Sequence, residues 1–438
     1  MSIGLITILL FASMIFFIAL GLPIAFSIGG VSVIFGLALW GPISTQIVAV
    51  KAITQMRTII LIAVPLFIFM ATMLERSGIA DDLYEMMHRW MGTLRGGLAM
   101  GTVFICTIFA AMSGISGAGT VTMGIIALPN MLKRGYDKSL AIGCIMAGGA
   151  LGVLIPPSVI MIIYGLFSRQ SVGKLFAGGL LPGLLLSTLF VVYIGIRCYF
   201  NPRLGPILPP EERASWQLKL ICLRAVILPL LLVVGVLGSI FLGMATPTEA
   251  ASVGSFGAII CAAIHRRLGW SMLMAAAKRT LRTTAMIMWI ILASAIFCGV
   301  YQGLGAAELM EEMLMKAAVS KWLILGMIQL SFLILGCFVD PVGILMMTTP
   351  VYLPVITFLG FDPLWYGIVF VVNMEMAFLT PPFGSNLFYM KGVAPKDVTM
   401  LDIYRSITPF VLLQMLGLAL VIAFPQIALF LPSLLFQS

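Results

Sequence analysis

The sequence predicts an all-α polytopic membrane protein made of two inverted-topology repeats, each with a re-entrant helical hairpin and a proline-broken helix. Three observations predict this class: an extremely apolar composition, two proline pairs that recur in the same register, and different charge in the loops that correspond between the halves. Of 438 residues, 61% are hydrophobic and 9% are charged, whereas soluble proteins have roughly 25% charged residues. The chain is therefore divided into membrane spans of about 20 residues rather than into soluble domains.

The charge pattern, the cysteine spacing and the first apolar run do not indicate a nucleic-acid-binding protein, a paired-cysteine site or a cleaved signal. The formal net charge of +9 comes from short basic clusters between apolar runs, a pattern that membrane orientation produces, so no nucleic-acid partner is predicted. The seven cysteines are scattered in or beside apolar runs without a paired CxxC spacing, and we interpret them as small buried residues. The apolar run 3–20 has no basic start and no small-residue cleavage pattern, so we predict a retained helix.

Apolar runs separated by Gly, Pro and charged residues predict the helical segments. Two pairs of runs are too short to cross the membrane comfortably and are joined by tight turns, "MSGISGAG" at 112–119 and "FVDPVG" at 338–343. We therefore predict one re-entrant hairpin in each half, near 96–132 and 322–358. The predicted runs lie near 3–20, 23–40, 57–74, 97–112, 118–132, 139–167, 176–198, 225–242, 247–264, 283–301, 322–338, 342–358, 364–390 and 406–434.

Each half also contains a span that two prolines interrupt. Pro156 and Pro157 lie inside "GGALGVLIPPSVIMIIYG" (148–165), and Pro381 and Pro382 lie in a similar apolar run. Proline removes a backbone donor and clashes with the carbonyl four residues before it. The freed backbone groups are tolerated at membrane depth only where protein or a water-filled cavity satisfies them. We therefore predict broken helices near 139–167 and 364–390, a feature typical of transport sites.

An internal repeat is visible when the chain is shifted along itself by 225 residues, the separation of Pro156 and Pro381. Chance supplies one or two such matches among common membrane residues, but an unshifted register that holds two proline pairs and a Gly-aromatic-Asp turn indicates duplication. The shift places Leu128-Pro129 on Leu353-Pro354, Gly135-Tyr136-Asp137 on Gly360-Phe361-Asp362, Pro156-Pro157 on Pro381-Pro382, and Tyr164 on Tyr389.

Loop charge predicts that the two halves have opposite orientations. Loop 133–138 carries Lys133, Arg134 and Lys138, whereas the corresponding loop 358–363 has no base. Lys and Arg accumulate in cytoplasmic loops, so the halves are inverted and both termini are predicted to be periplasmic. The predicted organisation is a first repeat at 1–200, a cytoplasmic connector at 201–220 that lies along the membrane, and a second repeat at 221–438.

The breaks and the hairpin tips together predict a binding site near the membrane midplane. Freed carbonyls suit a small hard cation, and positive half-helix ends suit an anionic substrate group. The first tip adds hydroxyl oxygens and flexible backbone, and the second tip adds a carboxylate. The predicted ion ligands are Ser113, Gly114, Ser116, Leu154, Ile155, Pro156, Asp340, Gly343, Thr380 and Pro381.

A substrate pocket is predicted beside the ion ligands. Glu375 belongs to it because an ionisable group inside an apolar run is expensive and usually faces a cavity. The other members are small residues, polar residues or prolines near the tips and breaks. The predicted pocket residues are Gly117, Gly148, Gly149, Pro157, Ser158, Asn373, Glu375 and Pro382.

Several of these residues have a structural alternative. The small residues at 112–119, and Gly148 and Gly149, also suit close helix packing. Asp340 also suits a helix cap at the membrane surface. Glu249, which follows Pro247 closely, is interpreted as a first-turn carboxylate at a helix N-terminus.

The sequence does not predict an enzyme. It has no Gly-rich loop that ends in Gly-Lys-Ser/Thr and no His, Cys or carboxylate cluster with metal-site spacing, so neither ATP hydrolysis nor metal catalysis is indicated. An intramembrane hydrolase is the enzyme alternative, but it needs a serine with a His or Lys partner at membrane depth. We place both histidines, His88 and His265, in loops. A channel or structural subunit is the other alternative, and it does not need paired broken helices.

Several motifs taken together resemble a known family. The chain resembles the large membrane subunit of the tripartite ATP-independent periplasmic (TRAP) transporters over nearly its whole length. The motifs that carry the resemblance are "SGISGAGTVTMG" (113–124), "KRGYDKSLA" (133–141), "GVLIPPS" (152–158), "TPTEAASVG" (246–254) and "NMEMAFLTPPFGSNLF" (373–388).

This resemblance implies an elevator-type, sodium-coupled importer of organic acids, such as C4-dicarboxylates, keto acids or sialic acids, in the bacterial inner membrane. The implied partners are a small four-helix membrane subunit and a soluble periplasmic binding protein that delivers the substrate. Sodium is the only implied metal, as a coupling ion, and no other cofactor is implied. In the family, sodium sites lie where hairpin tips approach broken helices, which carries over onto Ser113, Gly114, Ser116, Asp340, Gly343 and the carbonyls before the proline pairs. An ion-coupled organic-anion carrier or antiporter without a binding protein is the alternative.

Overall fold

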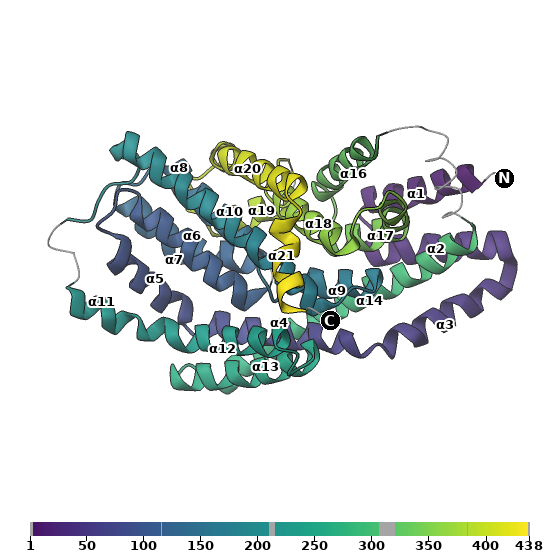
Figure 1. Cartoon of the computed structure of the whole chain (residues 1–438), viewed down its shortest axis with the longest axis horizontal. Helices are drawn as coiled ribbons and strands as arrows, with labels where there is room; N and C mark the ends of the chain where they lie inside the picture. Colours follow the sequence, from purple (N-terminus) through teal and green to yellow (C-terminus); the bar gives the residue numbers. More distant parts are fainter. Residues whose placement is uncertain (1–2, 115, 210–214, 306–319, 383, 437–438) are drawn as a thin grey trace.

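The computed structural model describes residues 3–114, 116–209, 215–305, 320–382 and 384–436, and every regular element in these ranges is a helix (Figure 1). Seven helices are long and apolar enough to cross a membrane, or up to eight if one bent pair counts as a span. The predicted all-α polytopic class is therefore confirmed. Residues 210–214 of the predicted connector and residues 306–319 of the predicted second repeat lie outside the described residues.

The first half begins with helices at one end of the molecule and continues into a hairpin and a broken helix (Figure 1). Short 3-10 turns, η1 (Gly41–Ile43) and η2 (Ile59–Ile62), precede α3 and α4. The helices are α1 (Ile3–Ala19), α2 (Ile24–Trp40), α3 (Ser44–Met56), α4 (Ala63–Arg76), α5 (Ile79–Met91), α6 (Gly97–Ser113), α7 (Ser116–Lys133), α8 (Lys138–Ala150), α9 (Val159–Ser168) and α10 (Val172–Phe200).

The second half follows a short connector with one 3-10 turn, η4 (Pro202–Leu204). Its helices also form a hairpin, α16 with α17, and a broken helix, α18 with α19. The helices are α11 (Trp216–Cys222), α12 (Arg224–Phe241), α13 (Pro247–Ile264), α14 (Trp270–Gly303), α16 (Lys321–Gly336), α17 (Pro341–Phe358), α18 (Pro363–Ala377), α19 (Ser385–Val393), α20 (Met400–Ala423) and α21 (Gln426–Leu435).

Helix starts in the two halves follow the register of the sequence repeat. Helices α7 and α17 begin 225 residues apart, at Ser116 and Pro341, and so do α8 and α18, at Lys138 and Pro363. The two hairpins and the two broken helices therefore occupy equivalent places in the chain.

Several segments differ from the expected spans, among them α3 (Ser44–Met56), which lies between two predicted runs. The run predicted at 406–434 is two helices, because α20 ends at Ala423 and Pro425, which has no backbone donor, starts the next one. Helix α14 begins at Trp270, well before the predicted start near 283, and is one continuous helix of 34 residues. Helix α5 was not expected and contains His88, which we had placed in a loop. Its apolar face is buried and its polar face is exposed, so its hydropathy is too low for a span signal.

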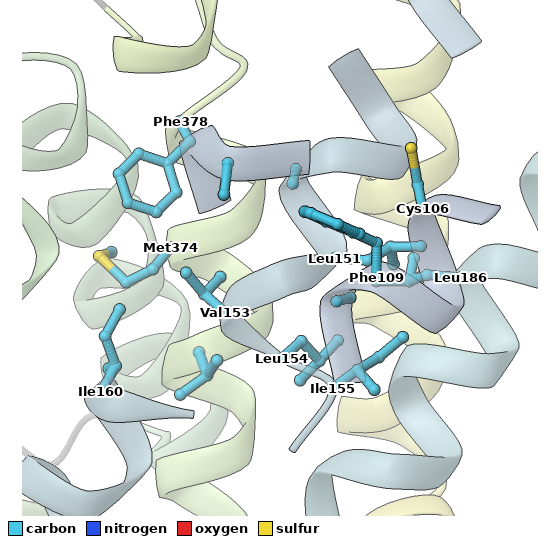
Figure 2. Close-up of a cluster of buried hydrophobic side chains, with 14 of the residues drawn as sticks. Cys106, Phe109, Leu151, Val153, Leu154, Ile155, Ile160, Leu186, Met374 and Phe378 are labelled. Atoms are coloured by element: carbon cyan, nitrogen blue, oxygen red, sulfur yellow. The ribbon is translucent and has the colours of Figure 1, made fainter. Parts of the chain in front are cut away.

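The two breaks differ in their surroundings. Helix α8 ends at Ala150, a 3-10 turn (Leu151–Val153) follows, and α9 starts at Val159. Both proline pairs have cis peptide bonds. Pro156 and Pro157 are buried, whereas Pro381 and Pro382 are exposed. Figure 2 shows the side chains of Leu151, Val153, Leu154 and Ile155 between Met374 and Phe378 on one side and Cys106, Phe109 and Leu186 on the other. The first break is therefore enclosed in the apolar core.

Candidate ion and substrate site

Both hairpin tips line one cavity of about 390 Å³. The first tip contributes Gly114, Ser116 and Gly117, and the second contributes residues 336–342, among them Asp340. The remaining walls come from α9, α14, α19, one residue of α4, Val153 at the first break and Phe378 at the end of α18. The cavity therefore joins elements of both halves, as the sequence predicted for a site between the tips.

The first tip lies directly on the proline break of its own half. Gly114 has φ of +62°, a left-handed conformation that glycine adopts without strain, and it ends α6. A Cβ atom at Gly114 would lie 2.3 Å from the carbonyl oxygen of Pro157, so the two backbones are in contact. Only a residue without a side chain permits this approach.

The first tip also contacts the broken helix of the other half, which the sequence did not predict. The Ser116 hydroxyl donates a hydrogen bond of 3.0 Å to Oδ1 of Asn386 in α19. Gly117 lies against the ring of Tyr389, also in α19, since an added Cβ would be 2.5 Å from that ring. Asn386 is fully buried, and its Nδ2 is a buried donor for which the described residues supply no partner.

The second tip is capped by Asp340, which has the structural role considered for it in the sequence. Its Oδ1 accepts a 2.9 Å hydrogen bond from the backbone N–H of Val342, so it caps the N-terminus of α17. It also lines the cavity. The thiol of Cys337 lies 3.9 Å from the carbonyl oxygen of Pro381, which brings this tip to the second break. Gly343, in contrast, packs against Ile24 of α2 and is not among the cavity-lining residues.

The carbonyls of the first break are arranged differently from our expectation. The Leu154 carbonyl oxygen lies against Gly179 of α10, because a Cβ there would be 2.6 Å from it, so it does not face the tip. The Ser158 hydroxyl donates to the Val153 carbonyl at 2.6 Å and caps α9. The carbonyl at the tip is that of Pro157, one residue beyond the predicted ligand Pro156. Ile155 packs its side chain against Gly183 of α10.

Two predicted oxygens of the second break have partners close by. The Thr380 hydroxyl donates to the Met376 carbonyl at 2.9 Å within the same chain segment. The Pro382 carbonyl accepts a 3.0 Å hydrogen bond from the Tyr404 hydroxyl of α20. Both groups retain accepting capacity, because each oxygen has more than one lone pair.

Of the predicted pocket residues only Gly117 lines the cavity; Pro157, Ser158 and Pro382 lie at the breaks, and the other four lie in helix contacts or in the buried core. Gly148 and Gly149 have the packing environment that was their alternative: a Cβ at Gly148 would lie 2.8 Å from the Cβ of Cys106, and one at Gly149 would lie 2.5 Å from the backbone nitrogen of Thr120. Asn373 and Glu375 are fully buried in α18. None of these four residues lines the cavity.

Asn373 and Glu375 belong to a buried polar group that links α18 to α16 and α20. Nδ2 of Asn373 donates to the side-chain oxygen of Gln329 at 2.8 Å, and Nε2 of Gln414 donates to Oε1 of Glu375 at 3.2 Å. The Glu375 Oε2 and Gln414 Oε1 atoms are buried without a hydrogen-bond partner among the described residues. Glu249, as predicted, forms a capping box with Thr246 at the start of α13.

Sequence reasoning missed several cavity residues, among them Arg279, Thr283, Ser385 and Tyr389. The predicted span near 283–301 began four residues after Arg279, so Arg279 fell outside it. Its spacing of four residues from Thr283 and eight from Ile287 is the helical signal that extends α14 toward the N-terminus. Among the described residues, no group of three or more His, Cys, Asp or Glu could hold a metal ion, so a cation here depends on backbone, hydroxyl and single carboxylate oxygens.

Known proteins resemble this chain in sequence and in fold. A family model for the "Tripartite ATP-independent periplasmic transporter, DctM component" matches residues 11–427. The C4-dicarboxylate TRAP transporter large permease protein DctM of Vibrio cholerae is 34% identical over 98% of this chain and 97% of its own length. The ectoine TRAP transporter large permease protein TeaC of Halomonas elongata is 32% identical over 98% of this chain and its own full length.

A solved structure gives independent support for the fold alone. MtrF of Neisseria gonorrhoeae, from a class of antimetabolite efflux pumps, superposes with a TM-score of 0.60 at 14% identity, over 90% of this chain and 85% of MtrF. The sequence relatives are permease subunits, so this chain is a transporter subunit and not an enzyme. The chain belongs to the tripartite ATP-independent periplasmic (TRAP) transporter family, as a large membrane permease subunit.

Proposed function

We propose that this chain is the translocating subunit of a sodium-coupled secondary importer of organic acids. The cavity shared by both hairpin tips carries the proposal, because it combines hydroxyl and backbone oxygens with one carboxylate and one base. Oxygen-rich tips suit a small hard cation, and the base suits an anionic substrate.

The proposed sodium ligands belong to two places. At the first tip they are Ser113, Gly114, Ser116 and the Pro157 carbonyl, which lies against Gly114. At the second tip they are Asp340, Thr380 and the Pro381 carbonyl, which lies near Cys337. Sodium at both tips orders the hairpins and completes the pocket, so sodium raises substrate affinity and, by linkage, substrate raises sodium affinity.

The proposed movement is of the elevator type, in two inverted repeats. The hairpins and broken helices move together, while α2, α4, α12 and α13 serve as scaffold. Two observations support the inverted repeats: the helix starts of the hairpins recur after 225 residues, and the corresponding loops 133–138 and 358–363 differ in basic residues. Both termini are then periplasmic and the protein lies in the bacterial inner membrane.

Relatives indicate the class of substrate and partner. The two relatives described above transport C4-dicarboxylates and ectoine by name, and both kinds of molecule carry a carboxylate. The family is tripartite, which supports a small four-helix membrane subunit and a soluble periplasmic binding protein as partners. The organic acid is delivered by that binding protein.

Uptake into proteoliposomes tests the function. The chain, reconstituted with its small subunit, receives binding protein loaded with radiolabelled succinate or ectoine, with and without an inward sodium gradient. We expect uptake only with both sodium and the binding protein. Accumulation without sodium contradicts the coupling, and sodium-driven uptake without the binding protein supports the alternative, a carrier that binds its substrate directly.

A substitution at the first tip tests the position of the site. Ser116→Trp fills the cavity beside Asn386 and abolishes uptake while the protein still reaches the membrane. Ser252→Trp, on an exposed part of α13, is the matched control and retains uptake. Normal uptake by the Ser116 variant places the site elsewhere.

A further inference from the structure

Among the described residues that line the cavity between the tips, Arg279 is the one base and Asp340 is the one acid. Arg279 lies on α14, and three more residues of this helix line the cavity: Thr283, Met286 and Ile287. Their distances of four, seven and eight residues from Arg279 place all four on one helix face. That face is therefore turned toward the cavity with Arg279 included.

A carboxylate holds the Arg279 side chain in place. Nη1 of Arg279 donates to Oε2 of Glu75, in the last turn of α4, at 2.7 Å. The Glu75 side chain is 17% exposed and the Arg279 side chain 39% exposed. A guanidinium has five N–H donors in a rigid plane, and Glu75 is its hydrogen-bond partner among the described residues. The contact to Glu75 thus orients the plane and leaves donors for a second anion.

We propose that Arg279 binds the carboxylate of the transported substrate, and that Glu75 is a positioning residue that fixes the guanidinium. This inference rests on the proposed transport of organic acids. Arginine is suited to the task because it presents two parallel N–H donors to one carboxylate and stays charged. A neutral analogue of the substrate lacks the group that Arg279 recognises and is bound more weakly.

The position of Arg279 gives the bound anion a defined relation to the tips. Arg279 comes from α14, whereas Ser116 and Asp340 come from the two hairpins. A substrate anchored on Arg279 thus shares one cavity with residues of both tips. Its carboxylate is repelled by Asp340 unless a cation neutralises that residue, which gives sodium a direct electrostatic effect on substrate binding.

Two variants of Arg279 and one control test the proposal. Arg279→Gln removes the charge, and Arg279→Lys keeps the charge but loses the planar pair of donors. Arg282→Gln removes a base from the same helix that is exposed and does not line the cavity. Sodium-driven uptake of succinate and ectoine is measured in the reconstituted complex. We expect KM to rise at least about tenfold for Arg279→Gln, less for Arg279→Lys, and by less than about twofold for Arg282→Gln.

A double variant that also replaces Glu75 separates the loss of substrate binding from a loss of folding. The double variant Glu75→Gln, Arg279→Gln leaves neither partner of this ion pair charged, and it is expected to keep the thermal stabilisation of the purified protein by sodium but to lose that by succinate. Recovery of uptake in the double variant, or an unchanged KM in Arg279→Gln, overturns the proposal, because Arg279 then only neutralises Glu75. If the unsubstituted protein takes up neither succinate nor ectoine, the proposed function fails for these substrates before Arg279 is tested.

Discussion

Replacement of Gly114 by alanine tests whether the backbone contact at the first tip is needed for ion binding. Gly114 has φ of +62°, and an alanine in this left-handed region costs about 1–2 kcal/mol. Its Cβ would also lie 2.3 Å from the Pro157 oxygen, and since contacts below 3.0 Å essentially never occur, the two backbones must separate by about 0.7 Å. A hard cation such as Ca²⁺ binds oxygen at roughly 2.3–2.6 Å, so this displacement removes a well-placed ligand.

A substitution at a second glycine separates the effect of left-handed backbone strain from the effect of the contact with Pro157. Gly135, in the turn between α7 and α8, has φ of +75° and nothing within 4 Å of an added Cβ. Gly135→Ala therefore carries the same backbone strain of about 1–2 kcal/mol without the contact to Pro157. Both variants are expected to lower the thermal unfolding temperature, Gly114→Ala by more because of its added contact with Pro157, but only Gly114→Ala is expected to impair uptake.

Sodium titration of uptake in proteoliposomes is the assay. We expect the sodium concentration for half-maximal uptake to rise at least tenfold for Gly114→Ala, which corresponds to about 1.4 kcal/mol of lost ion binding. Gly135→Ala should keep the sodium dependence of the unsubstituted protein. If both variants have the same sodium dependence, the contact between Gly114 and Pro157 does not shape an ion site, and the reasoning about the first tip is refuted.

Two further pairs of substitutions test the packing and the buried polar group. Gly149→Ala places a Cβ 2.5 Å from the backbone of Thr120, and we expect it to lower the free energy of unfolding by about 1–3 kcal/mol. The control is Gly326→Ala, in a helix where an added Cβ has nothing within 4 Å. It should leave the free energy of unfolding unchanged or raise it. Glu375→Gln keeps the shape of the side chain and its contact with Gln414, so it should change the free energy of unfolding by less than about 1 kcal/mol. Glu375→Ala leaves a cavity and an unpaired amide and should cost about 2–4 kcal/mol. Equal losses of stability in the two variants would contradict the importance of the polar contact.

The sequence predicts features that depend on a few residues acting locally. The proline pairs at 156–157 and 381–382 interrupt helices, and the turn at 338–343 separates two apolar runs, so the breaks and the hairpin turns could be predicted without tertiary information. The repeat register is equally local, because it needs only two matching segments. The polytopic class follows from composition, and the motifs were sufficient to identify the family.

The details of the site depend on contacts that no local pattern encodes. Which carbonyl meets the first tip is decided by the path of the chain between α8 and α9, which turns Leu154 toward α10 and Pro157 toward Gly114. Arg279 lies in the cavity because α14 continues past the apolar run, where hydropathy alone suggests a loop. A glycine such as Gly149 suits both a substrate pocket and a close helix contact. Only the position of its neighbour Thr120 in the structure shows that Gly149 is a packing residue.

The hydrogen bond between Ser116 and Asn386 joins residues that are 270 positions apart and belong to different halves of the chain. A cation that coordinates a lone pair of the Ser116 oxygen polarises its O–H group and strengthens the hydrogen bond to Asn386, and it thereby stabilises α19, which follows the second break. The two ion sites are then not independent, and their occupancy should give a Hill coefficient above one for sodium. Asn386→Ala, which removes the link but no proposed ion ligand, should lower that coefficient toward one.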